Sequence, residues 1–269
     1  MWLRSFLLAA GLVGAATLSA AAAEMVSVEA DGTEFKVTMS SGAVLRSRDL
    51  AGAELTVRVH SREVVMRIDA VERDPDAKRG AVWLHTLSAR AADGSWHNVC
   101  EAGPDGRRRA FPLAVRARPE GMFEDSDPTV FELTCTGGAI GKCVRFGYLP
   151  WPAGGDLALY NACVRMVRAD YCGQGEGTTR NGMRIDLYDD AGIQKADNDP
   201  VQEFEAGWNA AGAVCVHHVR VKENTSLDAL AKSCPRLREH LGPDCTEAGA
   251  RASAPPCSTA RRRRATGRL

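Results

Sequence analysis

The segment DLALYNACVRMVRADYC at residues 156–172 determines how the second half of this chain folds. Apolar residues recur in it at steps of three and four, which predicts an amphipathic helix over residues 156–171. Cys163 and Cys172 lie nine positions apart, which is about 13 Å along a helix. A disulfide needs Cα atoms within about 7 Å. Cys163 therefore cannot pair with Cys172, and each must reach another segment.

The other cysteines extend this argument to the whole chain. The sequence holds nine cysteines but no C-x-x-C, and its histidines lack zinc-ligand spacing, so we expect no metal and no cofactor. Eight cysteines are expected to form four disulfides in one of the 105 connectivities open to eight cysteines, and these are Cys100, Cys135, Cys143, Cys163, Cys172, Cys215, Cys234 and Cys245. Cys257 lies beyond two prolines near the end of the chain and is expected to stay unpaired.

The first 23 residues have the pattern of a secretory signal peptide. Arg4 precedes an uncharged apolar stretch, and the small residues Ala21 and Ala23 favour cleavage before Glu24. The apolar stretch is too short for a membrane span. We therefore expect an exported protein, periplasmic or extracellular, that is soluble and not membrane-spanning after cleavage, in a compartment where disulfides persist.

Residues 246–269 are predicted to form a disordered basic tail, because they offer no apolar face to bury. Six arginines minus Glu247 give this tail a charge of +5. Its removal is expected to leave the fold intact. The partner is unknown. The tail could contact an envelope polymer or protein, or simply be solvated, and it does not indicate a specific nucleic acid.

Between the ends, residues 24–130 have alternating apolar residues and Asp-Gly turns, which predict an antiparallel β-rich region. The expected strands are 34–39, 54–60, 63–71, 81–89 and 110–117. Residues 131–245 hold the helix already described, a second predicted helix at 226–241 and strands at 182–188 and 213–221. The fold class is therefore α+β, mainly β, with a disulfide-rich second region. The two regions form either one domain or two.

The motif Val167-Arg168-Ala169-Asp170-Tyr171-Cys172-Gly173 resembles the ADYC domain, a family of exported bacterial proteins named after this tetrapeptide. Similar pieces are residues 135–143, 147–151, 162–166, 182–194 and 205–216. The resemblance covers about residues 94–245, and the β-rich region is expected to belong to it too. The family is functionally uncharacterised, so the resemblance implies no activity.

Asp170 is the first candidate for a functional side chain. It falls on the apolar face in the last turn of the predicted helix, where the helix dipole disfavours a carboxylate. Arg145, Arg180 or His217 could pair with it, which would be typical of a functional site. Alternatively, Asp170 accepts backbone N–H groups from the glycine-rich segment 173–177 and fixes that turn.

Two functions follow from these alternatives. The leading hypothesis is a non-catalytic, disulfide-stabilised binding or structural module of the cell envelope or exterior. The second is a secreted hydrolase with a site around Asp170, His217 and Arg180. A nucleophilic Cys172 beside His217 has suitable residue types, but an exported protein favours a disulfide there. Convergence of these side chains on an open cleft would favour the hydrolase, and burial with satisfied hydrogen bonds would favour the module.

Overall fold

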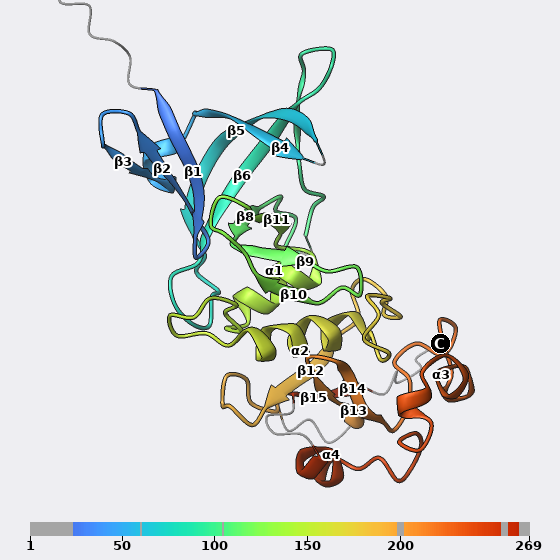
Figure 1. The fold of residues 1–269 in the computed structure, drawn as a ribbon. Helices are drawn as coiled ribbons and strands as arrows, with labels where there is room; N and C mark the ends of the chain where they lie inside the picture. The colour runs from blue at the N-terminus through green and yellow to red at the C-terminus, as the bar shows by residue number, and fades with distance from the viewer. Residues whose placement is uncertain (1–23, 60, 104, 198–201, 254–257, 264–269) are drawn as a thin grey trace, which may run out of the picture.

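The N-terminal part of the protein is built from antiparallel sheets (Figure 1). The computed structural model describes residues 24–253, apart from residues 60, 104 and 198–201, and the backbone of residues 258–263. The three-stranded sheet consists of β1 (Met25–Asp31), β2 (Glu34–Met39) and β3 (Val44–Arg46), and a short 3-10 turn, η1 (Ser47–Leu50), follows it. The antiparallel β region predicted from residues 24–130 is confirmed.

A six-stranded sheet continues from there. Its order is β11-β8-β6-β5-β4, with β7 also paired to β6. Its strands are β4 (Glu54–Val59), β5 (Arg62–Arg73), β6 (Trp83–Arg90), β7 (Trp96–Asn98), β8 (Ala110–Leu113) and β11 (Glu132–Cys135). In β5, Met66 and Ile68 are buried while Arg67 and Asp69 are not, which is the alternation that period-2 strand geometry requires. A separate pair consists of β9 (Val115–Ala117) and β10 (Phe123–Asp125).

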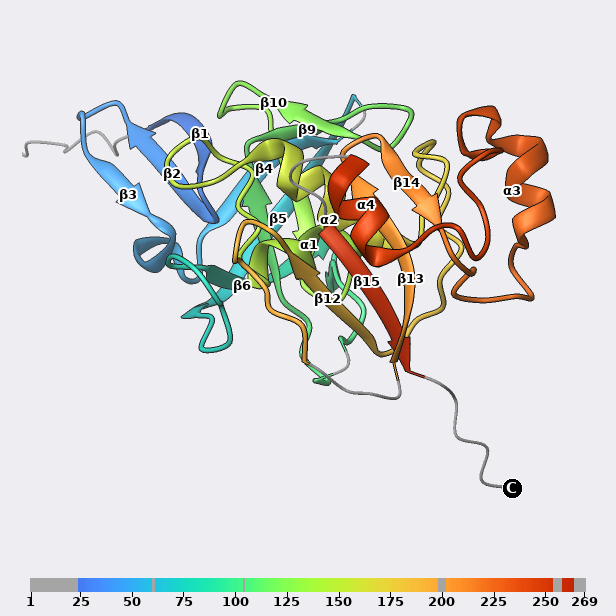
Figure 2. The same ribbon diagram turned by 90° about the horizontal axis from the view of Figure 1, so that it is seen from below.

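The C-terminal part combines a second sheet with helices. A four-stranded sheet has the order β12-β15-β13-β14, and its members are β12 (Ile185–Asp189), β13 (Gln202–Asn209), β14 (Gly212–Val216) and β15 (Ser258–Arg263). The helices are α1 (Ala139–Arg145), α2 (Leu157–Arg168), α3 (Leu227–Ser233) and α4 (Glu247–Ser253), and η2 (Pro235–Leu237) follows α3. Figure 2 shows this sheet and α4 together from below. Helices α1 and α4 were not predicted.

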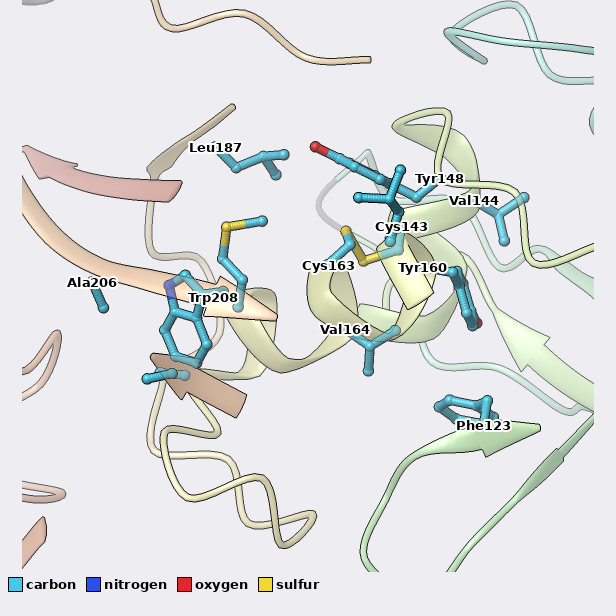
Figure 3. Close-up of a cluster of buried hydrophobic side chains, with 14 of the residues drawn as sticks. Phe123, Cys143, Val144, Tyr148, Tyr160, Cys163, Val164, Leu187, Ala206 and Trp208 are labelled. Carbon is cyan, nitrogen blue, oxygen red and sulfur yellow. A yellow bond between two sulfur atoms is a disulfide. The ribbon is translucent and has the colours of Figure 1, made fainter. Parts of the chain in front are cut away.

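Helix α2 lies between the β-rich part and the four-stranded sheet (Figure 1). Its N-terminus is fixed by Asp156, whose carboxylate accepts the N–H groups of Ala158 and Leu159. Its buried faces contact both sides, so Phe123 of β10 and Trp208 of β13 belong to one hydrophobic cluster with the helix (Figure 3). A second cluster fills the space between the three-stranded and six-stranded sheets.

Among the residues that the structure describes, four disulfides cross-link the fold. They join Cys100 to Cys135, Cys143 to Cys163, Cys172 to Cys234, and Cys215 to Cys245. The bridge between α1 and α2 is visible in Figure 3. The disulfide-rich character predicted for residues 131–245 is confirmed, and Cys163 and Cys172 have different partners. Cys257 and the proposed signal peptide, residues 1–23, lie outside the described residues.

Two predictions of local structure need correction. The single helix predicted over 226–241 is α3 followed by η2, because Pro235 lacks the N–H that a continuous helix needs at that position. The disordered tail predicted for 246–269 is wrong for residues 247–253, which form α4, and for residues 258–263, which form β15 between β12 and β13. Ala250 gives α4 a buried contact, and backbone pairing gives β15 its place. Among the described residues, no helix is long and apolar enough to cross a membrane.

Candidate functional site

Asp170 lies just past the C-terminus of α2 and is completely buried. Ala169 ends the helix in a left-handed conformation, with φ 52° and ψ 45°, so the chain turns back over the last helical turn. One carboxylate oxygen of Asp170 accepts the N–H groups of Gly173 and Gln174 at 3.0 and 3.1 Å. The other accepts the Gly175 N–H at 2.8 Å. Asp170 therefore braces the glycine-rich turn. This is the second of the two roles that the sequence left open for it, a structural role in place of a functional one.

The charge partner of Asp170 is Arg165, on the same helix. The two side chains are 2.5 Å apart, and neither is more than 2% exposed. Arg165 also donates to the carbonyl oxygens of Glu120 and Ala210, at 2.6 and 3.3 Å. The pair thus joins three turns of the chain. The predicted partners were wrong, because the left-handed residue at 169 brings Asp170 back over its own helix.

Tyr171 enters a second buried network. Its hydroxyl donates to Glu205 at 2.9 Å and accepts the backbone N–H of Arg220 at 2.7 Å. The Arg220 guanidinium binds both Glu205 oxygens, at 2.9 and 3.0 Å, and both of these charged side chains are 0% exposed. Burial and the neighbouring Glu205 carboxylate raise the pKa of Tyr171 well above its usual value. A phenol held neutral in this way serves as a hydrogen-bond bridge.

The same Arg220 guanidinium closes the end of α2. It donates to the carbonyl oxygens of Met166 and Val167 at 2.8 and 3.0 Å, which lie in the last helical turn, where carbonyl oxygens lack the usual N–H partner four residues on. Tyr171 also stacks on Trp208, with ring centroids 5.1 Å apart. With Cys172 in a disulfide, each residue of the Ala-Asp-Tyr-Cys tetrapeptide at 169–172 has a structural role.

The other candidate residues lie elsewhere. Arg145 forms a bidentate pair with the buried Asp74, at 2.6 and 3.2 Å, and fixes α1 to the loop after β5. Arg180 pairs with Glu223 at 3.3 Å on the surface. His217 follows β14 and hydrogen-bonds the Cys245 carbonyl oxygen through Nδ1 at 3.1 Å. In the described part of the chain, no hydrogen bond or ion pair joins Asp170, His217 and Arg180.

An open cavity of about 640 Å³ adjoins the C-terminal end of α2. Its walls are β11, the first turns of α1, the end of α2 and the segment 179–185 before β12. The volume falls in the range of small-molecule sites, about 300–1,000 Å³. Its larger apolar lining residues are Leu133, Ile140, Phe146, Val167, Met183 and Ile185.

The charged side chains around this cavity all carry the same sign. Lys142, Arg168, Arg180 and Arg184 line it, with Arg220 at its inner edge, and the described lining includes no Asp or Glu. The Arg220 charge is neutralised by Glu205. Arg168 donates to the Gly175 carbonyl oxygen at 2.7 Å. Within the residues that the structure describes, Lys142 and Arg184 have no side-chain hydrogen bond or ion pair.

Among the residues that line this cavity, the sequence indicated only Arg180 as a candidate functional residue. The cations are spread over α1, α2 and the segment before β12, so no short motif contains them. The sequence predicted a strand over residues 182–188, so Gly182, Met183 and Arg184 were assigned to strand structure. β12 begins only at Ile185, which leaves these three residues in a wall of the cavity. Among the described residues, no cluster of three potential metal ligands occurs.

Comparison with known proteins gives one finding. A family model described as the ADYC domain matches residues 47–222. The match begins earlier than residue 94, where the resemblance in the sequence was placed, and so includes β4, β5 and β6. It also includes every residue that lines the cavity. No curated protein and no solved structure matches the chain.

Proposed function

The chain belongs to the ADYC domain family, and from this premise we propose that it is an exported, non-catalytic binding module of the cell envelope or exterior. The observation that carries the proposal is the contrast between two neighbouring parts of the domain. Ala169, Asp170 and Tyr171 are buried, and Cys172 is held in a disulfide. The charges around the tetrapeptide form buried ion pairs, Arg165 with Asp170 and Arg220 with Glu205. The cavity between α1 and residues 179–185 is open, and two of its cations have no partner in the described residues.

The contrast also weighs against the hydrolase hypothesis. A general base must lie within hydrogen-bond reach of the group it activates, yet Asp170, His217 and Arg180 have three separate sets of partners. Cys172 is held in a disulfide with Cys234 and is therefore not a thiolate nucleophile. Asp170 is saturated by three backbone N–H groups and Arg165.

Export is supported by the signal-peptide pattern of residues 1–23 and by the four disulfides, which persist in oxidising compartments. We expect the mature protein to begin at Glu24. Intact-mass measurement of protein recovered from the periplasm and the medium checks both the cleavage site and the location. Recovery of the uncleaved chain in a membrane fraction would contradict export as a free protein.

The binding function is tested on the oxidised mature chain with a fragment library, by ligand-observed NMR. Ile140→Trp and Met183→Trp place bulk on opposite walls of the cavity, and each is expected to abolish binding of the fragments that the wild type retains. Val44→Trp is the matched control, because Val44 is an exposed apolar residue of β3, far along the chain from the cavity. Its fragment binding is expected to equal that of the wild type.

The competing hydrolase function is measured on the same preparations. Chromogenic esters, phosphoesters and glycosides are expected to show no turnover above the rate of the buffer. Turnover that disappears in both His217→Ala and Arg180→Ala, in variants that remain folded, would replace the binding proposal with the hydrolase. Fragment binding that survives both cavity-filling variants would show that the cavity is not the binding site.

A further inference from the structure

We propose that the cavity binds an anionic amphiphile, a molecule with one carboxylate or phosphate head and an apolar chain. This inference rests on the proposed binding function and specifies the ligand. Two independent features of the cavity lead to it, the sign of its charged rim and the apolar character of its wall. Each feature selects for one part of such a molecule.

The charged rim selects for an anion. Four cations from three segments line one cavity without a carboxylate among the described lining. Like charges gathered in this way repel one another, and an anion relieves the repulsion. Arg168 and Arg180 already have partners in the described structure, but Lys142 and Arg184 have none there. Their ammonium and guanidinium groups can make charge-assisted hydrogen bonds to a carboxylate or phosphate, the guanidinium in a bidentate manner.

The surrounding charge makes this rim distinctive. From Glu24 to Cys245 the chain carries a net charge of −6, which follows from a total of 0 after subtracting +5 for residues 246–269 and +1 for Arg4. A positive cavity on a negatively charged body attracts a small anion locally, whereas an extended polyanion would meet the acidic remainder of the surface. The ligand is therefore expected to be a small molecule that enters the cavity.

The wall selects for an apolar chain. Leu133, Ile140, Phe146 and Met183 expose apolar surface inside the cavity, and such surface gains free energy when a ligand removes it from water. Methionine adapts its shape to flexible apolar ligands, because its side chain is unbranched and polarizable. Inorganic phosphate or acetate would satisfy the rim alone and leave this wall in contact with water.

The test uses isothermal titration calorimetry of the oxidised mature chain with ten-carbon probes below their micelle concentrations. Decanoate and decyl phosphate are expected to bind, and the two distinguish a carboxylate head from a phosphate head. Decan-1-ol and decyltrimethylammonium are expected to bind at least about tenfold more weakly. Octanoate, which lacks two methylene groups, is expected to bind about 15-fold more weakly than decanoate. Raising the salt concentration is expected to weaken decanoate but not decan-1-ol.

Variants separate the two parts of the ligand. Lys142→Gln and Arg184→Gln are each expected to weaken decanoate binding by about tenfold and to leave decan-1-ol binding unchanged. Arg62→Gln removes an exposed cation from the first position of β5 and is the matched control, with no expected effect. Met183→Trp is expected to abolish binding of every ten-carbon probe.

The outcomes distinguish this inference from the binding function on which it rests. Equal affinity for decan-1-ol and decanoate, both lost in Met183→Trp, would overturn the anionic head and leave the binding function standing. Inorganic phosphate that binds as tightly as decyl phosphate would overturn the apolar chain in the same way. If no probe binds while fragments still bind in the cavity, the ligand class is wrong. If neither probes nor fragments bind there, both proposals fail.

Discussion

Replacement of Asp170 by Asn tests the structural interpretation of the tetrapeptide. The amide retains one acceptor oxygen, which can continue to bind the Gly173 and Gln174 N–H groups. In the wild type, the Gly175 N–H and the Arg165 guanidinium both donate to the other carboxylate oxygen. In the mutant, the NH₂ group of Asn occupies that position and faces these two donors. Arg165 is left with its charge unpaired in a site where it is 1% exposed.

The cost follows from this geometry. Removing one partner of a buried ion pair lowers the free energy of unfolding by about 3–5 kcal/mol. With a urea m-value of about 3 kcal/mol/M for a chain of this size, the midpoint falls by about 1–1.7 M. The measurement is urea unfolding monitored by tryptophan fluorescence, with all disulfides kept oxidised. Asp244→Asn, an exposed carboxylate, is the control and is expected to leave the midpoint unchanged.

A double-mutant cycle attributes the loss to the pair. In Arg165→Met with Asp170→Asn, the combined destabilisation is expected to fall short of the sum of the single effects by about 1–3 kcal/mol, because the second replacement removes the unpaired charge. A midpoint that does not fall in Asp170→Asn, or single effects that simply add, would refute the bracing role of the carboxylate and return Asp170 to the list of functional candidates.

Three further predictions concern other parts of the fold. Burial lowers the pKa of His85 from 6.5 to about 4. Between these two pH values the unfolded chain binds a proton at this side chain and the folded chain does not. The free energy of unfolding present above pH 6.5 should therefore fall by about 3 kcal/mol as the pH drops to 4. Urea midpoints at pH 7.5 and 5 should show part of this loss in the wild type and less of it in His85→Gln. Tyr171→Phe removes the hydroxyl shared by Glu205 and Arg220 and should lower the free energy of unfolding by about 1–3 kcal/mol; an unchanged urea midpoint would contradict the bridge. A chain that ends at Cys245 lacks α4, whose Ala250 is buried beside Gly207, and β15, which pairs with β12 and β13. Its thermal midpoint should therefore fall by at least about 3–6 °C; an unchanged midpoint would restore the view that residues 246–269 contribute nothing to the fold.

The sequence predicted the elements whose signals are local. Strand β2 has the predicted bounds, and β4, β5 and β6 differ from prediction by only a few residues, because alternation of apolar and polar residues is set by each strand itself. Helix α2 was found for the same reason, with its capping residue Asp156 at the predicted start. The exclusion of a Cys163–Cys172 pair needed only the length of that helix.

Elements that depend on distant partners were missed. Helix α1 is short and glycine-containing, and it is held by the disulfide from Cys143 to Cys163 and by the ion pair of Arg145 with Asp74. Strand β15 has an arginine-rich sequence that no periodicity marks as a strand, and it exists through its pairing with β12 and β13. The partner of Asp170 was missed because the left-handed conformation of Ala169 reverses the direction that helical periodicity assigns to the next residue.

The tetrapeptide and the cavity show why a conspicuous motif can lead away from the proposed binding site. Ala169, Asp170, Tyr171 and Cys172 end α2, brace the turn after it and connect it to β13 and to η2, so a change at any of them disturbs several elements at once. The Arg220 side chain that Tyr171 helps to hold also reaches the inner edge of the cavity. The motif therefore acts on the cavity indirectly, by fixing the end of α2 and the chain that follows it. Ligand selectivity is then assigned to the dispersed cations and apolar residues of the cavity, which can change singly without disturbing that framework.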